Sequence, residues 1–352
     1  MGRNRLKVAV IGCGAVVERF HGPALSTLVD LGEVEVVALC DPDAARLGAV
    51  AKSFPRAATL TSVSNVAATQ PDLALIASPA GMHADQSIAL LEAGIHVLCE
   101  KPIAARTTDA ERMIAAAVRA RRVLAVGLFR RFYGSTRLVR GLVVSGRLGP
   151  LESAAIVETG GFDWPFRSTS AFRPELTPGG ILLDIGVHVL DLLSWWFPEV
   201  RVRAYEDDAM GGAEATAVAA LQVAHAPVSV RLSRDWPVAG RYDLRFEHGR
   251  IVWDGADPVN IQLEYSGPGA DVRLAAAGAP RLTLGDCFRA QLEDVIAAVR
   301  GGSAPAVSGA DALRSLGLIE QCYQVRTLLD SPWFTDAEVA AARSAAGERM
   351  AS

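Results

Sequence analysis

The chain has 352 residues, more than a single compact core usually holds, so we expect two domains. Half of its residues are hydrophobic and 21% are charged, a balance typical of globular proteins in water. Lysine and arginine number 35 and aspartate and glutamate 39, which gives a formal net charge of −4. This balance provides no general attraction for nucleic acid or for an anionic membrane surface, and we expect neither as a partner.

Five cysteines are spread along the chain without a C-x-x-C pair. We expect them to be buried, reduced thiols, which favours a cytoplasmic location. The first strand pattern begins within a few residues of Met1, which leaves no room for a signal peptide, and no apolar run reaches membrane-spanning length.

The first chemically informative stretch is Lys7–His21, in which a short apolar run leads into a glycine pair. Residues 6–11 predict a buried parallel strand, and a helical pattern begins at Ala15. Gly12 permits a tight turn off the strand, and Gly14 permits the close approach of a phosphate that the helix amides then face. We therefore expect a dinucleotide pyrophosphate to bind at Gly12, Cys13, Gly14, Ala15 and Val16.

Alternating strand and helix patterns extend from residue 5 to residue 127. Strands are predicted at 6–11, 34–40, 73–77, 95–99 and 123–126, and helices near 15–29, 43–53, 80–93 and 106–120. Such alternation with short apolar strands predicts a doubly wound parallel sheet. The first domain is therefore expected to be an α/β Rossmann domain over residues 1–127.

Asp41 ends the second predicted strand, at the interval where dinucleotide-binding folds hold the adenosine ribose. A carboxylate there accepts hydrogen bonds from ribose hydroxyls and repels a 2′-phosphate. Asp43 adds to this repulsion, and no arginine directly follows Asp41. We expect NAD as the cofactor, with NADP less favoured. The run Asp41-Pro42-Asp43 is also typical of a helix cap.

Two further strands end in polar segments. The strand at 73–77 leads into Ser78-Pro79-Ala80-Gly81-Met82-His83, and the strand at 95–99 leads into Glu100-Lys101-Pro102. Ligands of open parallel sheets lie beyond the carboxyl ends of the strands, so both segments should face the same crevice as the glycine turn. We expect the cofactor site to include Ser78, Pro79, His83, Glu100 and Lys101. Taken alone, Glu100–Pro102 is equally typical of a solvated turn.

The pattern changes in the second half of the chain. After a helix at 135–146, strand patterns appear at 151–158, 216–223, 227–233, 242–247 and 250–253 without regular helices between them. We expect an α+β domain over residues 128–352 with a largely antiparallel open sheet. Residues 267–281 predict a loop, and helices are predicted at 310–329 and 335–346.

The helical pattern at 181–197 is apolar in nearly every direction, which predicts a buried helix. Its polar exceptions Asp184, His188 and Asp191 are spaced i, i+4 and i+7, within about 60° of one face at 100° per residue. Their burial without partners would be costly. Three interpretations remain open. They are a structural network, a metal site that needs ligands from elsewhere, and a catalytic site in which His188 is the acid/base and Asp184 orients it or the substrate.

Residues 160–173 bring aromatic rings, hydroxyls and arginines together in one predicted loop that contains Trp164 and Arg167. Aromatic faces and hydrogen-bonding groups suit a polyhydroxylated ring. Arg167 and Arg173 also leave room for an anionic substituent. A loop held by its own aromatic residues is equally plausible.

Two of these stretches resemble the Gfo/Idh/MocA family of glucose–fructose oxidoreductase and inositol dehydrogenase. Members carry T/S-P-x-x-x-H after a strand, then A-G-K-H-V-x-x-E-K-P, and later G-G-G-x-L-x-D-x-G-x-H-x-x-D. This chain has S-P-A-G-M-H, A-G-I-H-V-L-C-E-K-P and P-G-G-I-L-L-D-I-G-V-H-V-L-D, so that Ile95 and Pro178 are departures. The resemblance spans nearly the whole chain and is weakest after about residue 254.

The resemblance implies an NAD-dependent oxidoreductase that transfers a hydride between nicotinamide and a secondary alcohol or ketone of a sugar, amino sugar or cyclitol. It implies that Lys101, Asp184 and His188 are catalytic. The expected substrate-binding residues are Lys101, Arg131, Trp164, Arg167, Asp184 and His188. A homodimer or homotetramer through the second sheet is also implied, and no metal is expected. Two alternatives remain, a glycosidase that oxidises its substrate transiently with tightly held NAD, and an NAD-binding sensor without turnover.

Overall fold

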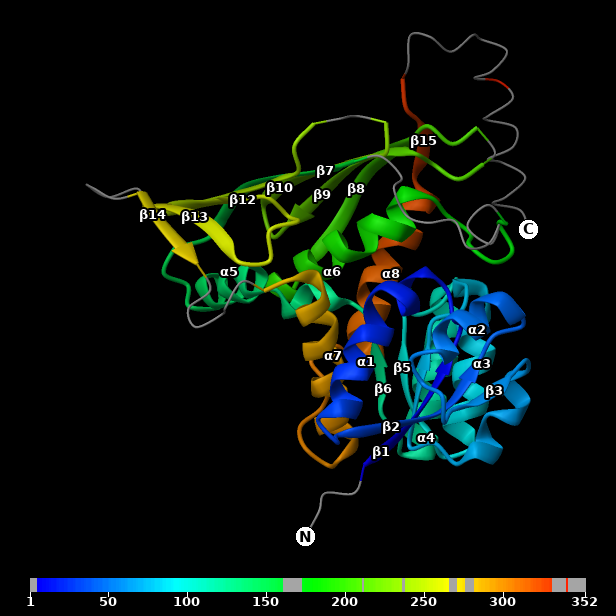
Figure 1. Ribbon diagram of the computed structural model, residues 1–352. Coiled ribbons are helices and arrows are strands. Elements are labelled where there is room, and N and C mark those ends of the chain that lie inside the picture. Colours follow the sequence, from blue (N-terminus) through cyan, green and yellow to red (C-terminus); the bar gives the residue numbers. More distant parts are fainter. Residues whose placement is uncertain are drawn as a thin grey trace. The chain divides into compact units, whose positions relative to one another are not determined.

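The computed structural model of the chain describes residues 5–160, 173–210, 212–235, 238–265, 271–275, 282–330 and 340 (Figure 1). These residues form two compact units. The first contains residues 5–132, 173–177 and 282–313, and the second contains the remaining described residues. Each unit is built from more than one segment of the chain, and the domain boundary expected after residue 127 stays a prediction.

A six-stranded parallel sheet forms the centre of the first unit. Its order is β3-β2-β1-β4-β5-β6, the arrangement of a dinucleotide-binding Rossmann sheet. The strands are β1 (Leu6–Ile11), β2 (Val34–Cys40), β3 (Ala58–Leu60), β4 (Leu73–Ile76), β5 (His96–Cys99) and β6 (Leu124–Val126). The predicted α/β class of this part of the chain is confirmed.

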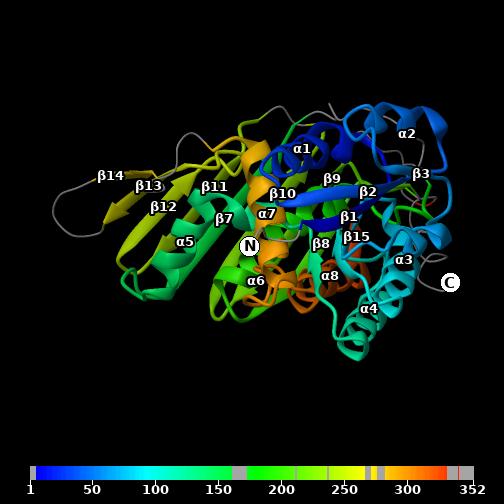
Figure 2. The ribbon, with the colours of Figure 1, turned by 60° about the horizontal axis from the view of Figure 1, so that its bottom comes forward.

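Helices cover both faces of this sheet (Figures 1 and 2). They are α1 (Gly22–Asp30), α2 (Ala44–Ala51), α3 (Ala80–Glu92), α4 (Thr107–Ala120) and α7 (Leu284–Val299). Helices α1, α2 and α7 share one apolar core with β1 and β2, which includes Leu25, Leu47 and Leu292. Helices α3 and α4 pack against each other on the other face. Strand β4 is fully buried and β1 is buried except at Lys7, as their largely apolar runs predict.

The helix predicted at 15–29 is not uniform. A π-helical turn spans Val17–His21, and the regular α-helix begins only at Gly22. Pro23 has no amide proton and cannot form the backbone hydrogen bond that a regular helix needs there, so the wider turn lies where the regular pattern would break. The short strand β3, two short 3₁₀ helices (Val63–Asn65 and Ala67–Thr69) and helix α7 were absent from the sequence-based prediction.

A nine-stranded mixed sheet forms the second unit, in the order β14-β13-β12-β11-β7-β10-β9-β8-β15. Only the pairs β7–β10 and β8–β15 are parallel among these described strands, so the predicted largely antiparallel sheet is confirmed. The strands are β7 (Leu151–Thr159), β8 (Val200–Asp207), β9 (Thr216–Val223), β10 (Ala226–Ser233), β11 (Arg241–Phe246), β12 (Gly249–Trp253), β13 (Asn260–Tyr265), β14 (Asp271–Ala275) and β15 (Arg326–Leu328).

Helices α5 (Gly134–Val144) and α6 (Val187–Trp196) pack together in this unit, on one side of its sheet (Figure 1). Residues along β10 alternate between buried and exposed, as expected for a sheet covered on one face. Helix α8 (Gly309–Gln324) is divided between the two units at Leu313, and a 3₁₀ helix spans Phe129–Phe132.

Three sequence-based expectations for the second half are corrected. The predicted loop at 267–281 contains β14, because Asp271–Ala275 pairs with β13. The helix predicted at 310–329 ends at Gln324, and Arg326–Leu328 forms the edge strand β15 beside β8. Strands β8 and β13 were not predicted. The expected helix at 335–346 lies, apart from residue 340, outside the described residues. None of the described helices has the length and apolar character needed to cross a membrane.

Candidate functional site

The glycine turn after β1 has the geometry that a bound phosphate requires. Gly12 has φ = +87°, and a Cβ there would lie 2.5 Å from the carbonyl oxygen of Ala77, so no other residue fits. A Cβ on Gly14 would meet no atom within 4 Å. The packing of the protein therefore requires Gly12, whereas the open space beside Gly14 fits the approach of a ligand to the backbone.

The helix that follows this turn offers amide groups to an anion. Its first bonded amides are those of Val17 and Glu18, which both donate to the carbonyl oxygen of Gly14 at 3.1 and 3.0 Å. The amides of Gly14, Ala15 and Val16 precede them at the helix N-terminus, where backbone amides have no helical acceptor. The residues present thus fit the pyrophosphate of a dinucleotide.

Asp41 lies at the end of β2, beside this turn. Its carboxylate accepts the amides of Cys13 and Asp43, both at 2.8 Å. Arg46, from the first turn of α2, donates Nη2 to Oδ1 at 2.8 Å, and its Nε lies 3.2 and 3.3 Å from the two carboxylate oxygens. The pKa of Arg46 is raised because its side chain donates to Asp41. Protein donors therefore occupy the carboxylate that was expected to hold the ribose.

Arg46 lies five residues after Asp41 and was not expected as its partner, because only an arginine directly after Asp41 was considered. Asp43 explains the placement of this arginine. Its side chain accepts the amides of Ala45 and Arg46 at 2.9 and 3.0 Å and caps α2, which fulfils the capping role expected for this run.

His83 connects the two polar segments that follow β4 and β5. Its Nε2 lies 2.7 Å from the carbonyl oxygen of Ser78, and its Nδ1 lies 2.8 Å from that of Pro102. Burial lowers the pKa of His83, and the two carbonyl contacts oppose this shift. The hydroxyl of Ser78 donates to Gln86 at 2.6 Å. The cofactor-binding roles of Ser78, Pro79 and His83 stay predictions, while the structure shows His83 holding the two segments together.

Lys101 follows β5 on a backbone that Glu100 fixes. One carboxylate oxygen of Glu100 accepts the amide of Lys101 at 3.0 Å, and the other lies 2.7 Å from Nε2 of His21. A Cβ on Gly127 would lie 2.9 Å from the Glu100 carboxylate, so this glycine makes room for the carboxylate. His21 is fully buried, and its ring packs edge-on against Phe288 at 4.9 Å. The backbone of Lys101 is thus held by Glu100, at the carboxyl ends of the strands where the glycine turn also lies.

Sequence reasoning named Glu100 but assigned no role to His21. The available signal was the place of this histidine in the helix that follows the glycine turn. An imidazole in an otherwise apolar pattern there must find a polar partner when it is buried.

In the second unit, Asp184 lies in a π-helical turn that spans Leu182–Gly186, immediately before α6. The 100° step assumed for the whole helix is therefore wrong over this turn, which is wider than an α-helical one. The side chain of Asp184 is 44% exposed and forms an ion pair with Arg234, which follows β10. Turns of this kind are frequent at functional sites.

His188 and Asp191 lie in the regular part of the helix and are 3% and 1% exposed. Gly186, between Asp184 and His188, packs against the sheet, since a Cβ there would lie 2.9 Å from a methyl group of Leu232 in β10. The absence of a side chain at Gly186 thus allows the helix to pack closely on β10. Along this helix, Asp184 is therefore accessible to solvent, whereas His188 is buried.

Two family models match the chain, and they cover most of both halves. The model described as the oxidoreductase family with an NAD-binding Rossmann fold matches residues 6–128, and the model of the GFO/IDH/MocA C-terminal domain matches residues 136–252. The chain belongs to the Gfo/Idh/MocA family. It is thus one of a family of sugar and cyclitol oxidoreductases with an NAD(P)-binding Rossmann domain.

The chain is similar in sequence to a named dehydrogenase and in fold to two solved structures. It is 33% identical over 207 residues to D-glucoside 3-dehydrogenase of Escherichia coli, a match that spans 57% of each chain. The WlbA dehydrogenase of Bordetella pertussis, solved with NADH and UDP-GlcNAcA, superposes with a TM-score of 0.79 at 24% identity, over 92% of this chain and 96% of that one. KijD10, a 3-ketoreductase of Actinomadura kijaniata solved with NADP, gives a TM-score of 0.79 at 20% identity, over 94% and 100%. The two structures show the same fold, and they contain different cofactors.

The remaining expected site residues are placed as follows. Trp164 and Arg167 lie outside the described residues. Arg131 is 2% exposed, and its Nη1 lies 3.2 Å from the carbonyl oxygen of Ala306 and 3.5 Å from Asp311. Its substrate-binding role stays a prediction. In the described ranges, no three histidine, cysteine, aspartate or glutamate side chains are grouped so that they could hold a metal ion.

Proposed function

We propose that this protein is an NAD-dependent dehydrogenase of a sugar, amino sugar or cyclitol, acting on a secondary alcohol or, in reverse, on the ketone. The observation that carries the proposal is the support of Lys101 by Glu100 at the end of β5. It lies in the same sheet and at the same strand ends as Gly12 and Gly14, which fit a dinucleotide.

In this proposal the chain supplies positioning and proton transfer. Bound NAD supplies the hydride acceptor. Lys101 donates a hydrogen bond from Nζ to the reacting oxygen, and His188 takes the hydroxyl proton as the carbon is oxidised. Asp184, accessible and oriented by Arg234, holds a substrate hydroxyl or the imidazole of His188. Lys101 and His188 belong to different units, and their action on one substrate is part of the proposal.

The substrate class rests on the family and on the loop at 160–173. Aromatic rings, hydroxyls and arginines in that loop suit a ring polyol, with or without an anionic substituent. A site built to hydrogen-bond several hydroxyls rejects simple alcohols, because its own polar groups would lose their partners.

The test is a substrate panel. Purified protein is incubated with NAD and with inositols, amino-cyclitols, aldoses, amino sugars and nucleotide sugars, and absorbance is followed at 340 nm, where NADH absorbs. We expect stoichiometric NADH from one or a few ring polyols. Release of an aglycone without net NADH would instead identify a glycosidase, and binding without turnover a sensor. NADH from short aliphatic alcohols alone would refute the substrate class.

Two further elements belong to the same proposal. The nine-stranded sheet is expected to form a homodimer or homotetramer, which light scattering after gel filtration would detect. None of the five cysteines forms a disulfide and all five are buried, which supports a reducing, cytoplasmic location.

A further inference from the structure

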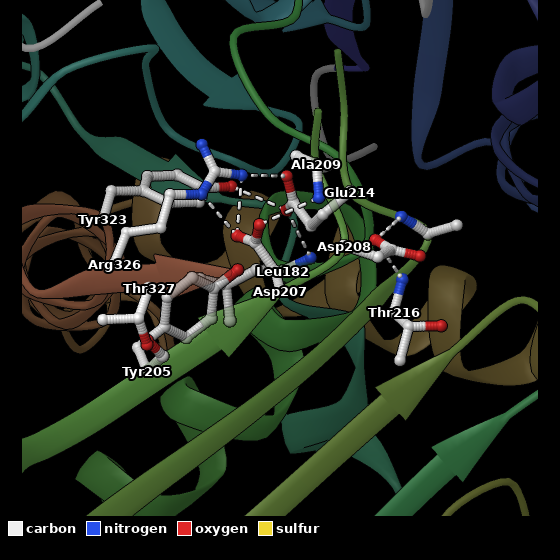
Figure 3. Close-up of polar contacts among 11 residues, drawn as sticks. Leu182, Tyr205, Asp207, Asp208, Ala209, Glu214, Thr216, Tyr323, Arg326 and Thr327 are labelled. Carbon is white, nitrogen blue, oxygen red and sulfur yellow. Dashed lines mark hydrogen bonds and ion pairs between the residues drawn. The ribbon is translucent and has the colours of Figure 1, made fainter. Parts of the chain in front are cut away.

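The helix that carries Asp184 and His188 begins against a buried polar cluster within the second unit (Figure 3). We call this set the anchor cluster, and its members are Asp207 of β8, Glu214 before β9, Tyr323 of α8 and Arg326 of β15. Asp207 and Glu214 are 1% and 3% exposed. Buried carboxylates need partners, and the cluster supplies them.

Glu214 accepts hydrogen bonds from the first amides of the helix. Its backbone carbonyl accepts the amide of Ile181 at 2.9 Å, and its Oε1 accepts the amide of Leu182 at 3.1 Å. Helix N-terminal amides have no acceptor within their own helix. Glu214 thus caps this helix from a distant segment of the chain, and its negative charge lies at the favourable end of the helix dipole.

Two glycines let the helix start approach the cluster closely. A Cβ on Gly180 would lie 2.0 Å from the carbonyl oxygen of Glu214, and a Cβ on Gly179 would lie 2.3 Å from the hydroxyl oxygen of Tyr323. Both distances are shorter than any real contact of a Cβ atom. The backbone of Glu214 therefore requires glycine at position 180, and Gly179 leaves room for the hydroxyl of Tyr323.

The rest of the cluster holds the Glu214 carboxylate in place. The hydroxyl of Tyr323 donates to Oε1 of Glu214 at 2.8 Å. Arg326 donates Nε to Asp207 at 2.6 Å, and its Nη2 lies 3.5 Å from Oε2 of Glu214. Its guanidinium also lies over the ring of Tyr323, at 5.3 Å from the centroid. Figure 3 shows these side chains converging on Glu214 from the strands and from the end of α8.

We propose that Glu214 and Tyr323 are positioning residues that fix the start of this helix and, through it, Asp184 and His188. The proposal rests on the proposed function of those two residues. Leu182, whose amide Glu214 accepts, is two residues before Asp184 and six before His188. A shift of the capped turn therefore moves the accessible carboxylate directly and the buried imidazole through the same helix.

The test compares two tyrosines of the same neighbourhood. Tyr323→Phe removes the hydroxyl that holds Glu214. Tyr205→Phe is the matched control, because Tyr205 packs edge-on against Tyr323 at 5.8 Å and its hydroxyl makes no hydrogen bond to the described start of the helix. We expect Tyr323→Phe to lower kcat about tenfold, which corresponds to one hydrogen bond, with NADH affinity unchanged. The control is expected to retain wild-type kcat.

A double variant separates positioning from general stability. In a His188→Asn background, measured by single turnover at high enzyme concentration, Tyr323→Phe is expected to have little further effect on the rate, because the two residues act through one structure. The same tenfold loss in both backgrounds, or an equal loss from Tyr205→Phe, would overturn the proposal.

A third readout does not depend on catalysis. If His188→Asn leaves turnover unchanged, the proposed role of His188 as the base fails, and the imidazole resonances of His188 then decide the present inference. The six histidines are distinguished by the signal that His188→Asn removes. Tyr323→Phe should shift this signal, and Tyr205→Phe should not. An unshifted signal in Tyr323→Phe would show that the anchor cluster does not position His188.

Discussion

The pair formed by Arg46 and Asp41 leads to a specific prediction about cofactor choice. Asp41 already accepts two amides and the side chain of Arg46, so ribose hydroxyls can bind the carboxylate only when Arg46 moves away. We expect the displaced guanidinium to stay near the ribose and to attract a 2′-phosphate there. Replacing it by methionine, which keeps the apolar stem, should therefore affect NADH and NADPH in opposite directions.

The expected change in cofactor affinity follows from the solvent exposure of the Arg46–Asp41 pair. The side chain of Arg46 is 22% exposed and that of Asp41 5%. Hydrogen bonds to charged groups contribute about 1.5–3 kcal/mol when buried, and exposed ion pairs about 1 kcal/mol or less. We therefore expect that displacing Arg46 from Asp41 costs about 1 kcal/mol of free energy. Arg46→Met should tighten NADH binding about fivefold and weaken NADPH binding by a similar factor, which changes their ratio about 25-fold.

Cofactor binding is measured by fluorescence titration of the unmodified protein and of each variant. We expect the unmodified protein to bind NADH at least about tenfold more tightly than NADPH, because Asp41 repels the 2′-phosphate. Arg112→Met is the control, since Arg112 pairs with Asp109 on the exposed side of α4. If Arg46→Met changes both affinities by the same factor, Arg46 is not a determinant of cofactor choice. Equal affinities in the unmodified protein would remove Asp41 from its assigned role.

Two other predictions concern the glycine turn and the cysteines. Gly14→Ala should fold with an unchanged melting temperature but bind NADH at least tenfold more weakly. Gly12→Ala should be destabilised by more than about 1 kcal/mol, because Gly12 has a positive φ and lies close to the carbonyl of Ala77. Equal melting temperatures for the two variants would contradict these different roles of the two glycines. The thiols should be inert in the native protein, because burial raises the pKa of Cys13 to about 12 and all five cysteines are buried. A thiol-specific dye at pH 8 should label none of them until the protein is denatured, and rapid labelling of the native protein would refute this.

The first sheet was predictable because its strands obey one simple rule. Parallel strands buried on both faces are largely apolar runs, and residues 6–11, 34–40 and 73–77 have this composition, with Lys7 and Glu35 as the charged exceptions. Their ends then placed Asp41 and Lys101 at one edge without any knowledge of side-chain contacts. Strand β3 has only three residues, and they are mostly exposed, so it has no apolar run that would predict it.

Helix α7 could have been predicted from the capping motif at its N-terminus. Thr283 accepts the amide of Asp286, and Asp286 accepts the amide of Thr283, which is a capping box with aspartate in place of glutamate. Behind it, Phe288, Leu292 and Val295 follow helical spacing and are buried. Strand β8 also alternates in sequence, but its side chains are mostly polar or small, so its hydrophobic signal is weak.

The family motifs name candidate site residues but give no information on the partners of their side chains. Motif spacing identifies Lys101, Asp184 and His188, but hydrogen bonds between distant segments decide how they are held. His21 and Glu100 are 79 residues apart, and Glu214 caps a helix that begins 32 residues before it. Such pairs depend on the tertiary fold, which no local pattern encodes.

The central claim, that polar residues on both units perform chemistry, is tested most directly by single-turnover rates of Lys101→Met and His188→Asn with the best substrate of the panel. We predict that each variant forms NADH at least about a hundredfold more slowly than the unmodified protein, the scale of acid–base and electrostatic contributions. Melting temperature and NADH affinity should change little. Activity that falls only in proportion to the folded fraction in both variants would show that these residues are structural, and would contradict the account.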